Sequence, residues 1–97
     1  MSSSTRKIIF SENARSEFES ACAWYEDQRK GLGAQFVLYI EAKLEMIRKS
    51  PELFPLVYSN YRKATLKRFP YLIFFEIVDE NIHLLAVFHT SRKPKYS

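Results

Sequence analysis

The sequence is poor in the residues that build disulfide frameworks and phosphate-binding loops. Its 97 residues include one cysteine and two glycines. A single cysteine excludes an internal disulfide and a cysteine-rich metal centre, which fits a reducing compartment. Two glycines leave no glycine-rich phosphate loop, and neither a GxSxG nor an HExxH pattern occurs. The chain therefore carries no familiar catalytic signature.

Long apolar runs are also lacking. No run approaches the roughly 20 residues that span a bilayer, and the MSSSTRK start has no apolar segment of the kind found in signal peptides. We therefore expect a cytoplasmic protein without membrane contact. With 46% apolar and 27% charged residues, the composition is that of a soluble globular domain. We expect one domain over residues 1–97, with a short flexible N-terminus (1–5) and a basic C-terminal tail (89–97).

Positive charge is concentrated in the second half of the chain. Residues 1–52 carry eight basic and eight acidic side chains, whereas residues 53–97 carry seven basic and three acidic ones. The whole net charge of +4 therefore arises after residue 52. A solvated face is the ordinary explanation for such charge. Its concentration in two short runs is also typical of a protein that binds an acidic partner.

Two amphipathic helices are predicted in the first half. Ser11 is a suitable N-cap, and apolar residues then recur at helical spacing up to Tyr25. Gly31-Leu32-Gly33 predicts a short connection, so the second helix should return antiparallel to the first. That helix should end at Ser50-Pro51, because proline disfavours helix in the residue before it. Its apolar stripe is Phe36, Ile40, Leu44 and Ile47, widened by Val37.

The remaining apolar segments predict strands. They are residues 7–10, 62–67, 71–78 and 82–88. We expect an α+β fold of order β-α-α-β-β-β, in which the helical hairpin packs on one face of a small, mainly antiparallel sheet. In the central strand 71–78, Leu72 should share a face with Phe74 and Glu76. We expect Phe74, like Ile40, to be a core residue whose truncation costs about 2–5 kcal/mol.

The two histidines do not suggest a metal site. His83 and His89 lie six residues apart on one predicted strand, so they should face the same way about 20 Å apart. A structural role is favoured for His83. His89 begins the basic tail and is a candidate general acid or base near neutral pH.

A group of basic residues with an imidazole and a phenol among them is the main functional candidate. The cations hold phosphate and stabilise charge that develops on it, while histidine or tyrosine moves protons. The same group would suit electrostatic contact with an acidic protein. Composition does not distinguish an RNA-cleaving site from a surface that binds an acidic protein. The residues are Arg62, Lys63, Lys67, Arg68, His89, Arg92, Lys93 and Tyr96.

Three segments of the chain resemble the RelE/ParE superfamily of bacterial toxins. They are WYEDQRKGLGAQF (24–36), KRFPYLIFFEI (67–77) and AVFHTSRKP (86–94). The resemblance covers nearly all of residues 8–96 and implies the toxin of a type II toxin–antitoxin pair. The implied partner is a cognate antitoxin with a flexible segment that wraps the toxin in a hetero-oligomer. RelE-like members cleave ribosome-bound mRNA without a metal or cofactor, whereas ParE-like members inhibit DNA gyrase.

The nuclease pattern of the superfamily is only partly matched, so the resemblance favours the ParE side. Lys63 fits a basic position on the strand before the central one, with Lys67 and Arg68 as further candidates. Arg92 fits the arginine after the last strand, and Tyr96 fits a nearby tyrosine to within a residue or two. If the chain is RelE-like, Arg92, His89 and Tyr96 are the implied catalytic residues.

One arginine of that pattern is missing. It should follow an aromatic at the start of the central strand, where Tyr71 is followed by Leu72. Without it, part of the charge stabilisation at the scissile phosphate would be lost. A non-toxic nucleic-acid-binding module is a further alternative, and it would bind DNA or RNA in a salt-dependent manner.

Overall fold

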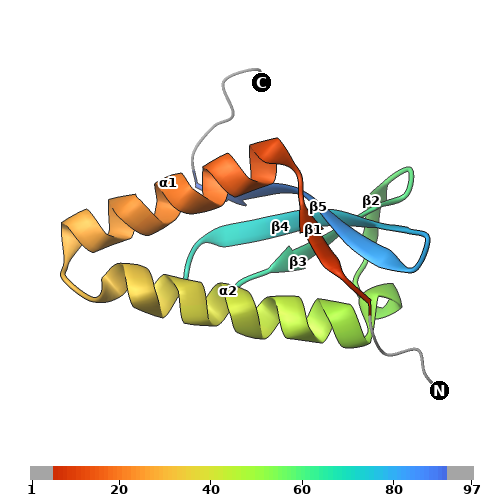
Figure 1. The fold of residues 1–97 in the computed structure, drawn as a ribbon, viewed down its shortest axis with the longest axis horizontal. Coiled ribbons are helices and arrows are strands. Elements are labelled where there is room, and N and C mark those ends of the chain that lie inside the picture. Colours follow the sequence, from red (N-terminus) through yellow and green to blue (C-terminus); the bar gives the residue numbers. More distant parts are fainter. Residues whose placement is uncertain (1–5, 92–97) are drawn as a thin grey trace.

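The helices pack on one face of a sheet, as the sequence predicts (Figure 1). This is a computed structural model that describes residues 6–91. The elements in chain order are β1 (Ile8–Phe10), α1 (Glu12–Gln28), α2 (Leu32–Lys49), the 3-10 helix η1 (Pro51–Leu53), β2 (Leu56–Tyr58), β3 (Tyr61–Thr65), β4 (Tyr71–Val78) and β5 (Asn81–His89). In the described residues, no helix is long and apolar enough to cross a membrane.

The sheet has the order β1-β5-β4-β3-β2. The pair β1–β5 is parallel and the other neighbouring pairs are antiparallel. The predicted α+β class and mainly antiparallel sheet are therefore confirmed. Strand β2 is an addition that the sequence did not predict, because its three residues are all exposed and show no alternation.

Local hydrogen bonds fix where the helices begin. The Ser11 hydroxyl accepts a hydrogen bond from the Ala14 amide at 2.9 Å, which confirms the predicted N-cap. The Ser11 amide donates to the Leu84 carbonyl at 3.0 Å, so the start of α1 is tied directly to β5. Gly31 has φ +89°, a left-handed conformation that favours glycine.

The connection between the helices is residues 29–31 and lies two residues earlier than predicted, because α2 already begins at Leu32 and includes Gly33. The Glu26 carboxylate holds this turn by accepting from the amides of Gly31 (2.9 Å) and Gly33 (3.0 Å). A Cβ on Gly33 would lie 2.8 Å from the carbonyl oxygen of Cys22 on α1. The helices therefore approach each other so closely at Gly33 that a side chain there would collide with α1.

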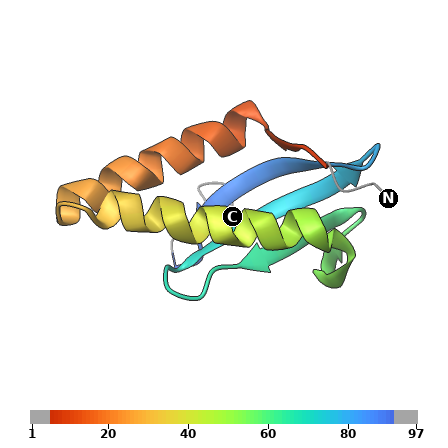
Figure 2. The ribbon, with the colours of Figure 1, turned by 60° about the horizontal axis from the view of Figure 1, so that its bottom comes forward.

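The core lies between the hairpin and the sheet (Figure 2). At its centre the Phe36 ring is fully buried, with ring centroids 5.1 Å from Tyr25, 5.2 Å from Phe69 and 5.1 Å from Tyr71. Ile40 is also fully buried, as predicted. The other buried apolar residues are Ala14, Ala21, Ile47, Ala64, Leu66, Ile73, Phe75, Ile82, Leu84 and Val87.

The second face of the sheet carries no helix of the described chain, and we call it the open face. Along β4, Tyr71, Ile73 and Phe75 are buried against the helices, whereas Leu72, Phe74 and Glu76 are half-buried on the open face. The predicted division of β4 into two faces is thus confirmed. The prediction that Phe74 is a core residue is wrong, because the helices cover only the opposite face.

A β-bulge in β5 separates the two histidines. Phe74 pairs with Ala86 while the next residue, Phe75, pairs with Leu84, so Leu85 is an extra residue. His83 consequently pairs with Glu76 on the open face, and His89 pairs with Tyr71 on the helix-covered face. The prediction that the histidines face the same way is therefore wrong, because the inserted residue reverses the alternation.

Side chains of Ser11 and of α1 close the outer edge of β5 beyond the short strand β1. The Ser11 hydroxyl and the Asn13 amide donate to the Leu85 carbonyl at 3.3 Å and 3.2 Å. The Glu17 carboxylate accepts from the Val87 amide at 2.7 Å. The Leu85 carbonyl and the Val87 amide are thereby hydrogen-bonded on the side of β5 where β1 no longer pairs with it.

Candidate functional site on the open face

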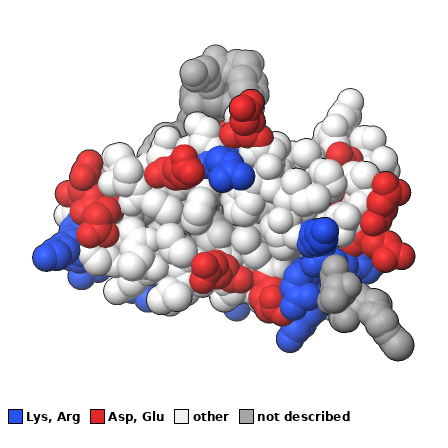
Figure 3. Space-filling view, in the orientation of Figure 1, with Lys and Arg blue, Asp and Glu red and all other residues white. Residues whose placement is uncertain are grey.

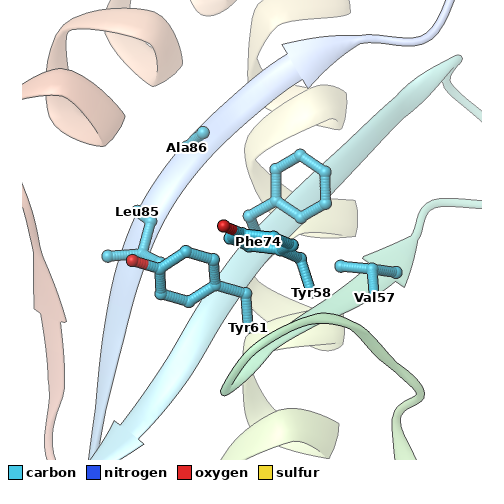
Figure 4. Close-up of a pocket in the computed structure, with 6 residues that line it drawn as sticks. All are labelled: Val57, Tyr58, Tyr61, Phe74, Leu85 and Ala86. Atoms are coloured by element: carbon cyan, nitrogen blue, oxygen red, sulfur yellow. The ribbon is translucent and has the colours of Figure 1, made fainter.

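An apolar pocket lies on the open face where β2 to β5 come together (Figure 4). Its volume is about 310 Å³. The lining residues are Val57 and Tyr58 of β2, Tyr61 of β3, Phe74 of β4, and Leu85 and Ala86 of β5. The bulge therefore brings Leu85 to the pocket, and β2 supplies one wall.

The tyrosines of this pocket are the exposed aromatics of the open face. Tyr58 is 72% exposed and Tyr61 is 38% exposed, with ring centroids 6.0 Å apart. Tyrosine combines a large apolar area with a polar hydroxyl, and exposed apolar patches on small proteins mark interaction sites. The pocket is suited to hold an apolar side chain of a partner protein. Its lining combines these two phenols with the apolar side chains of Val57, Phe74, Leu85 and Ala86.

Sequence reasoning missed the pocket. Tyr58 and Tyr61 were not among the candidate residues, although Ser59-Asn60 between them is a two-residue turn of the hairpin kind. That spacing was the available signal, and it would have predicted that the two tyrosines are neighbours across a strand pair.

Lys63 is the basic residue that strand β3 presents on the open face. It pairs with Phe74, and Thr65 pairs with Leu72. Leu72 in turn pairs with Phe88, so an apolar side chain occupies the position where the nuclease pattern requires a guanidinium. Among the described residues of β3, β4 and β5, no other lysine or arginine faces this side.

The remaining cations of the predicted group lie elsewhere. The Arg62 guanidinium donates to the carbonyls of Phe54 (2.7 Å) and Glu52 (3.3 Å), and so fastens η1 to β3. Arg68, in the connection between β3 and β4, donates to the Tyr39 hydroxyl at 3.1 Å, and its guanidinium carbon lies 5.7 Å from the centre of that ring. Lys67 is exposed beside it.

The C-terminal members of the group are only partly described. The His89 ring lies 5.1 Å from the Tyr71 ring on the helix-covered face, away from Lys63. Arg92, Lys93 and Tyr96 lie outside the described residues. Within residues 6–91, the predicted cations are therefore divided between the open face, the η1 contact and the β3–β4 connection. Figure 3 likewise shows acidic and basic side chains interspersed on the face that it draws.

Titratable groups with clear pKa shifts occur on the helices in the described part of the chain. Burial, together with the nearby Glu19 carboxylate, raises the pKa of the Cys22 thiol, which keeps it protonated near neutral pH. A hydrogen bond from Arg48 lowers the pKa of the exposed Glu45 carboxyl. Residues 6–91 contain no group of three or more His, Cys, Asp or Glu side chains that could hold a metal ion.

The Arg62 contact leads to a prediction about stability. We expect Arg62→Ala to lower the free energy of unfolding by about 1 kcal/mol, because the part-buried Phe54 carbonyl loses a charged donor. Urea unfolding followed by circular dichroism measures the change. The exposed Lys67→Ala is the control and should stay within about 0.5 kcal/mol of the parent chain. Equal stability of the two variants would contradict a structural role for Arg62.

A two-helix hairpin over one face of a five-stranded sheet, with the other face open, is the fold of RelE/ParE toxins. A chain of the chromosomal ParDE toxin–antitoxin system of Pseudomonas aeruginosa superposes with a TM-score of 0.78 at 15% identity, covering 92% of this chain and 100% of that chain. The isolated Escherichia coli RelE toxin gives a TM-score of 0.68 at 20% identity, covering 95% of this chain and 92% of that chain.

The family within this class follows from the sequence comparisons. The model of the ParE toxin of the type II toxin–antitoxin system parDE matches residues 8–94, and the chain belongs to this family. Toxin ParE2 of Mycobacterium tuberculosis is 25% identical over 91 residues, which cover 93% of this chain and 87% of that relative. The resemblance inferred from the three sequence segments is thus confirmed.

Proposed function

We propose that this ParE-family toxin arrests growth by inhibiting DNA gyrase and that a cognate antitoxin neutralises it in a hetero-oligomeric complex. Membership of the parDE toxin family supports the toxin–antitoxin part of the proposal. The proposal implies a cytoplasmic location, because gyrase acts on the chromosome there.

The observation that favours gyrase over mRNA is Leu72 on the open face. Cleavage of a phosphodiester requires positive charge close to the scissile phosphate, and losing a single stabilising donor typically costs about 10²–10³-fold in rate. Here Leu72 lies between Thr65 and Phe88 in the sheet. An isobutyl group cannot hold a phosphate or stabilise its charge.

The neighbourhood of Leu72 also favours a protein target. Lys63 is the one described cation on β3 to β5 that shares this face, and His89 packs against Tyr71 on the other face. The adjoining pocket instead offers Tyr58, Tyr61 and apolar side chains. Exposed tyrosines next to an apolar pocket are typical of protein–protein contacts.

Two assays on one preparation test the proposed target. We expect the purified chain to block gyrase-dependent supercoiling of relaxed plasmid in a concentration-dependent manner, and to leave mRNA on translating ribosomes uncut. The control is the same chain mixed beforehand with the product of the small reading frame beside its gene, which should restore supercoiling.

The opposite pattern would reverse the assignment. Codon-positioned cleavage of ribosome-bound mRNA with normal supercoiling would indicate a RelE-like nuclease. Arg92, His89 and Tyr96 would then be the first residues to test as catalytic. Salt-dependent nucleic-acid binding that survives addition of the antitoxin, without effect in either assay, would instead indicate a non-toxic binding module.

A further inference from the structure

Strand β3 has an outer edge that is only partly paired. The Leu66 amide donates to the Tyr71 carbonyl, so alternation directs the backbone groups of Arg62 and Ala64 toward β4 as well. The backbone groups of Lys63 and Thr65 therefore point away from β4. The hydrogen bond of the Lys63 amide agrees with this direction, because it is donated to the Pro55 carbonyl at 3.1 Å, on the side away from β4.

Pairing on this edge stops at Pro55. Proline has no amide hydrogen, so it can accept from Lys63 but cannot donate back to the Lys63 carbonyl. Strand β2 pairs only with Tyr61 and Arg62, which leaves Thr65 beyond its reach. Within residues 6–91, neither the Lys63 carbonyl nor the Thr65 amide and carbonyl has a hydrogen-bond partner on this side. Figure 2 shows the end of β3 that leads into the β3–β4 connection at the border of the sheet.

The free edge is surrounded by positive charge. Lys63 lies on the edge itself, and Lys67 and Arg68 stand two and three residues after the end of β3 at Thr65. Arg68 is held in place by its hydrogen bond to the Tyr39 hydroxyl. No acidic residue occurs between positions 53 and 75, so these cations are not neutralised by their own segment of chain.

This charge selects the kind of chain that can pair there. A second copy of the protein would bring Lys63, Lys67 and Arg68 against their own counterparts, and like charges across a strand pair are destabilising. Lysines on edge strands protect against self-association in this way. An extended segment rich in Asp and Glu would instead gain backbone hydrogen bonds and charge complementarity together.

We propose that the antitoxin adds an extended acidic segment to the outer edge of β3, pairing with the backbone of Lys63 and Thr65 beside Lys67 and Arg68. The inference rests on the proposed neutralisation by an antitoxin and names the surface to which the antitoxin attaches. The backbone bonds supply a sequence-tolerant attachment, and the cations set which chain is accepted. The antitoxin segment can therefore bind at this edge without a preformed pocket, through backbone hydrogen bonds and ion pairs alone.

Thr65→Pro is the variant that tests the edge. Proline removes the outward amide of residue 65, which takes no part in the β3–β4 ladder, and proline is tolerated on strand edges. The preceding Ala64 is already extended, as a residue before proline should be. Thr65→Val is the matched control, because it keeps the amide and suits a strand.

We expect Thr65→Pro to weaken binding of the full-length antitoxin at least about tenfold, with Thr65→Val within about twofold of the parent chain. Calorimetric titration with the product of the adjacent small reading frame measures both. Thermal unfolding of the free variants confirms that each is folded. In the parent complex, hydrogen exchange should show that the Thr65 amide becomes protected.

Charge reversal gives an independent readout. Lys67→Glu should weaken binding at low ionic strength, and the loss should shrink as salt is raised because salt screens exposed charges. Lys7→Glu makes the same change beside β1, on the opposite border of the sheet, and should have little effect.

The outcomes separate this inference from the proposed function. If the antitoxin binds and neutralises the parent chain but binds Thr65→Pro as tightly as Thr65→Val, the edge is not its attachment point and the inference is overturned. Unchanged exchange of the Thr65 amide in the complex would have the same meaning. If the antitoxin does not bind the parent chain, the proposed neutralisation fails and this inference fails with it.

Discussion

Replacing Phe36 by alanine is expected to lower the free energy of unfolding by about 3–5 kcal/mol. The Phe36 ring has no solvent exposure and is surrounded by the rings of Tyr25, Phe69 and Tyr71. Its removal would leave a cavity between three elements that the close-packed interior cannot refill. For a domain of this size, such a loss is a large fraction of the total stability of about 5–15 kcal/mol.

Phe74→Ala is the matched control for this prediction. It removes the same side chain from β4, but from the half-buried open face. We expect a clearly smaller loss in urea unfolding, because solvent already reaches part of that ring. Equal losses for the two variants would contradict the division of the sheet into a core face and an open face. Phe74→Ala is also the better probe of partner binding, since it alters the pocket in a chain that stays folded.

Replacing Gly33 by alanine is expected to destabilise the fold by about 1–3 kcal/mol. On helix propensity alone, alanine would be favoured over glycine by about 1 kcal/mol. The structure reverses this preference, because the added Cβ would meet the Cys22 carbonyl oxygen at 2.8 Å and the Glu26 side chain at 3.0 Å. A backbone oxygen cannot turn aside, so the two helices must separate.

Thermal unfolding measures this effect, since about 1 kcal/mol corresponds to a shift of about 4–8 °C in Tm for a domain of 60–100 residues. Gln35→Ala is the control, because Gln35 is exposed two residues further along the same helix. That variant should lie within about 0.5 kcal/mol of the parent chain. A Gly33→Ala variant as stable as the parent would show that the hairpin is not closely packed at this point.

The parts of the fold that could be predicted from the sequence depend on local rules. The N-cap at Ser11, the left-handed glycine at Gly31 and the alternation of β4 each follow from a few neighbouring residues. Strand β2 could not be predicted in this way. It exists because Pro55 and Leu56 pair with β3, and all three of its residues are exposed.

The candidate site was harder to predict for the same reason. The pocket requires β2 as one wall, and it requires the bulge at Leu85, which a continuous apolar strand sequence does not reveal. Strand alternation places Arg62 and Lys63 on opposite sides of β3. That Arg62 binds the carbonyls of Glu52 and Phe54 could not be inferred, because η1 comes into contact with it only in the folded chain.

The position of β1 beside β5 has a consequence for when the protein can fold. The first strand pairs with the last, and Ser11 and α1 complete the hydrogen bonding of residues 70 to 74 positions later. Contacts between such distant residues form late, because the intervening chain must first be brought together. The sheet therefore closes only when β5 is present to join β1 to β4, and a chain truncated before residue 81 could assemble neither the sheet nor the open face.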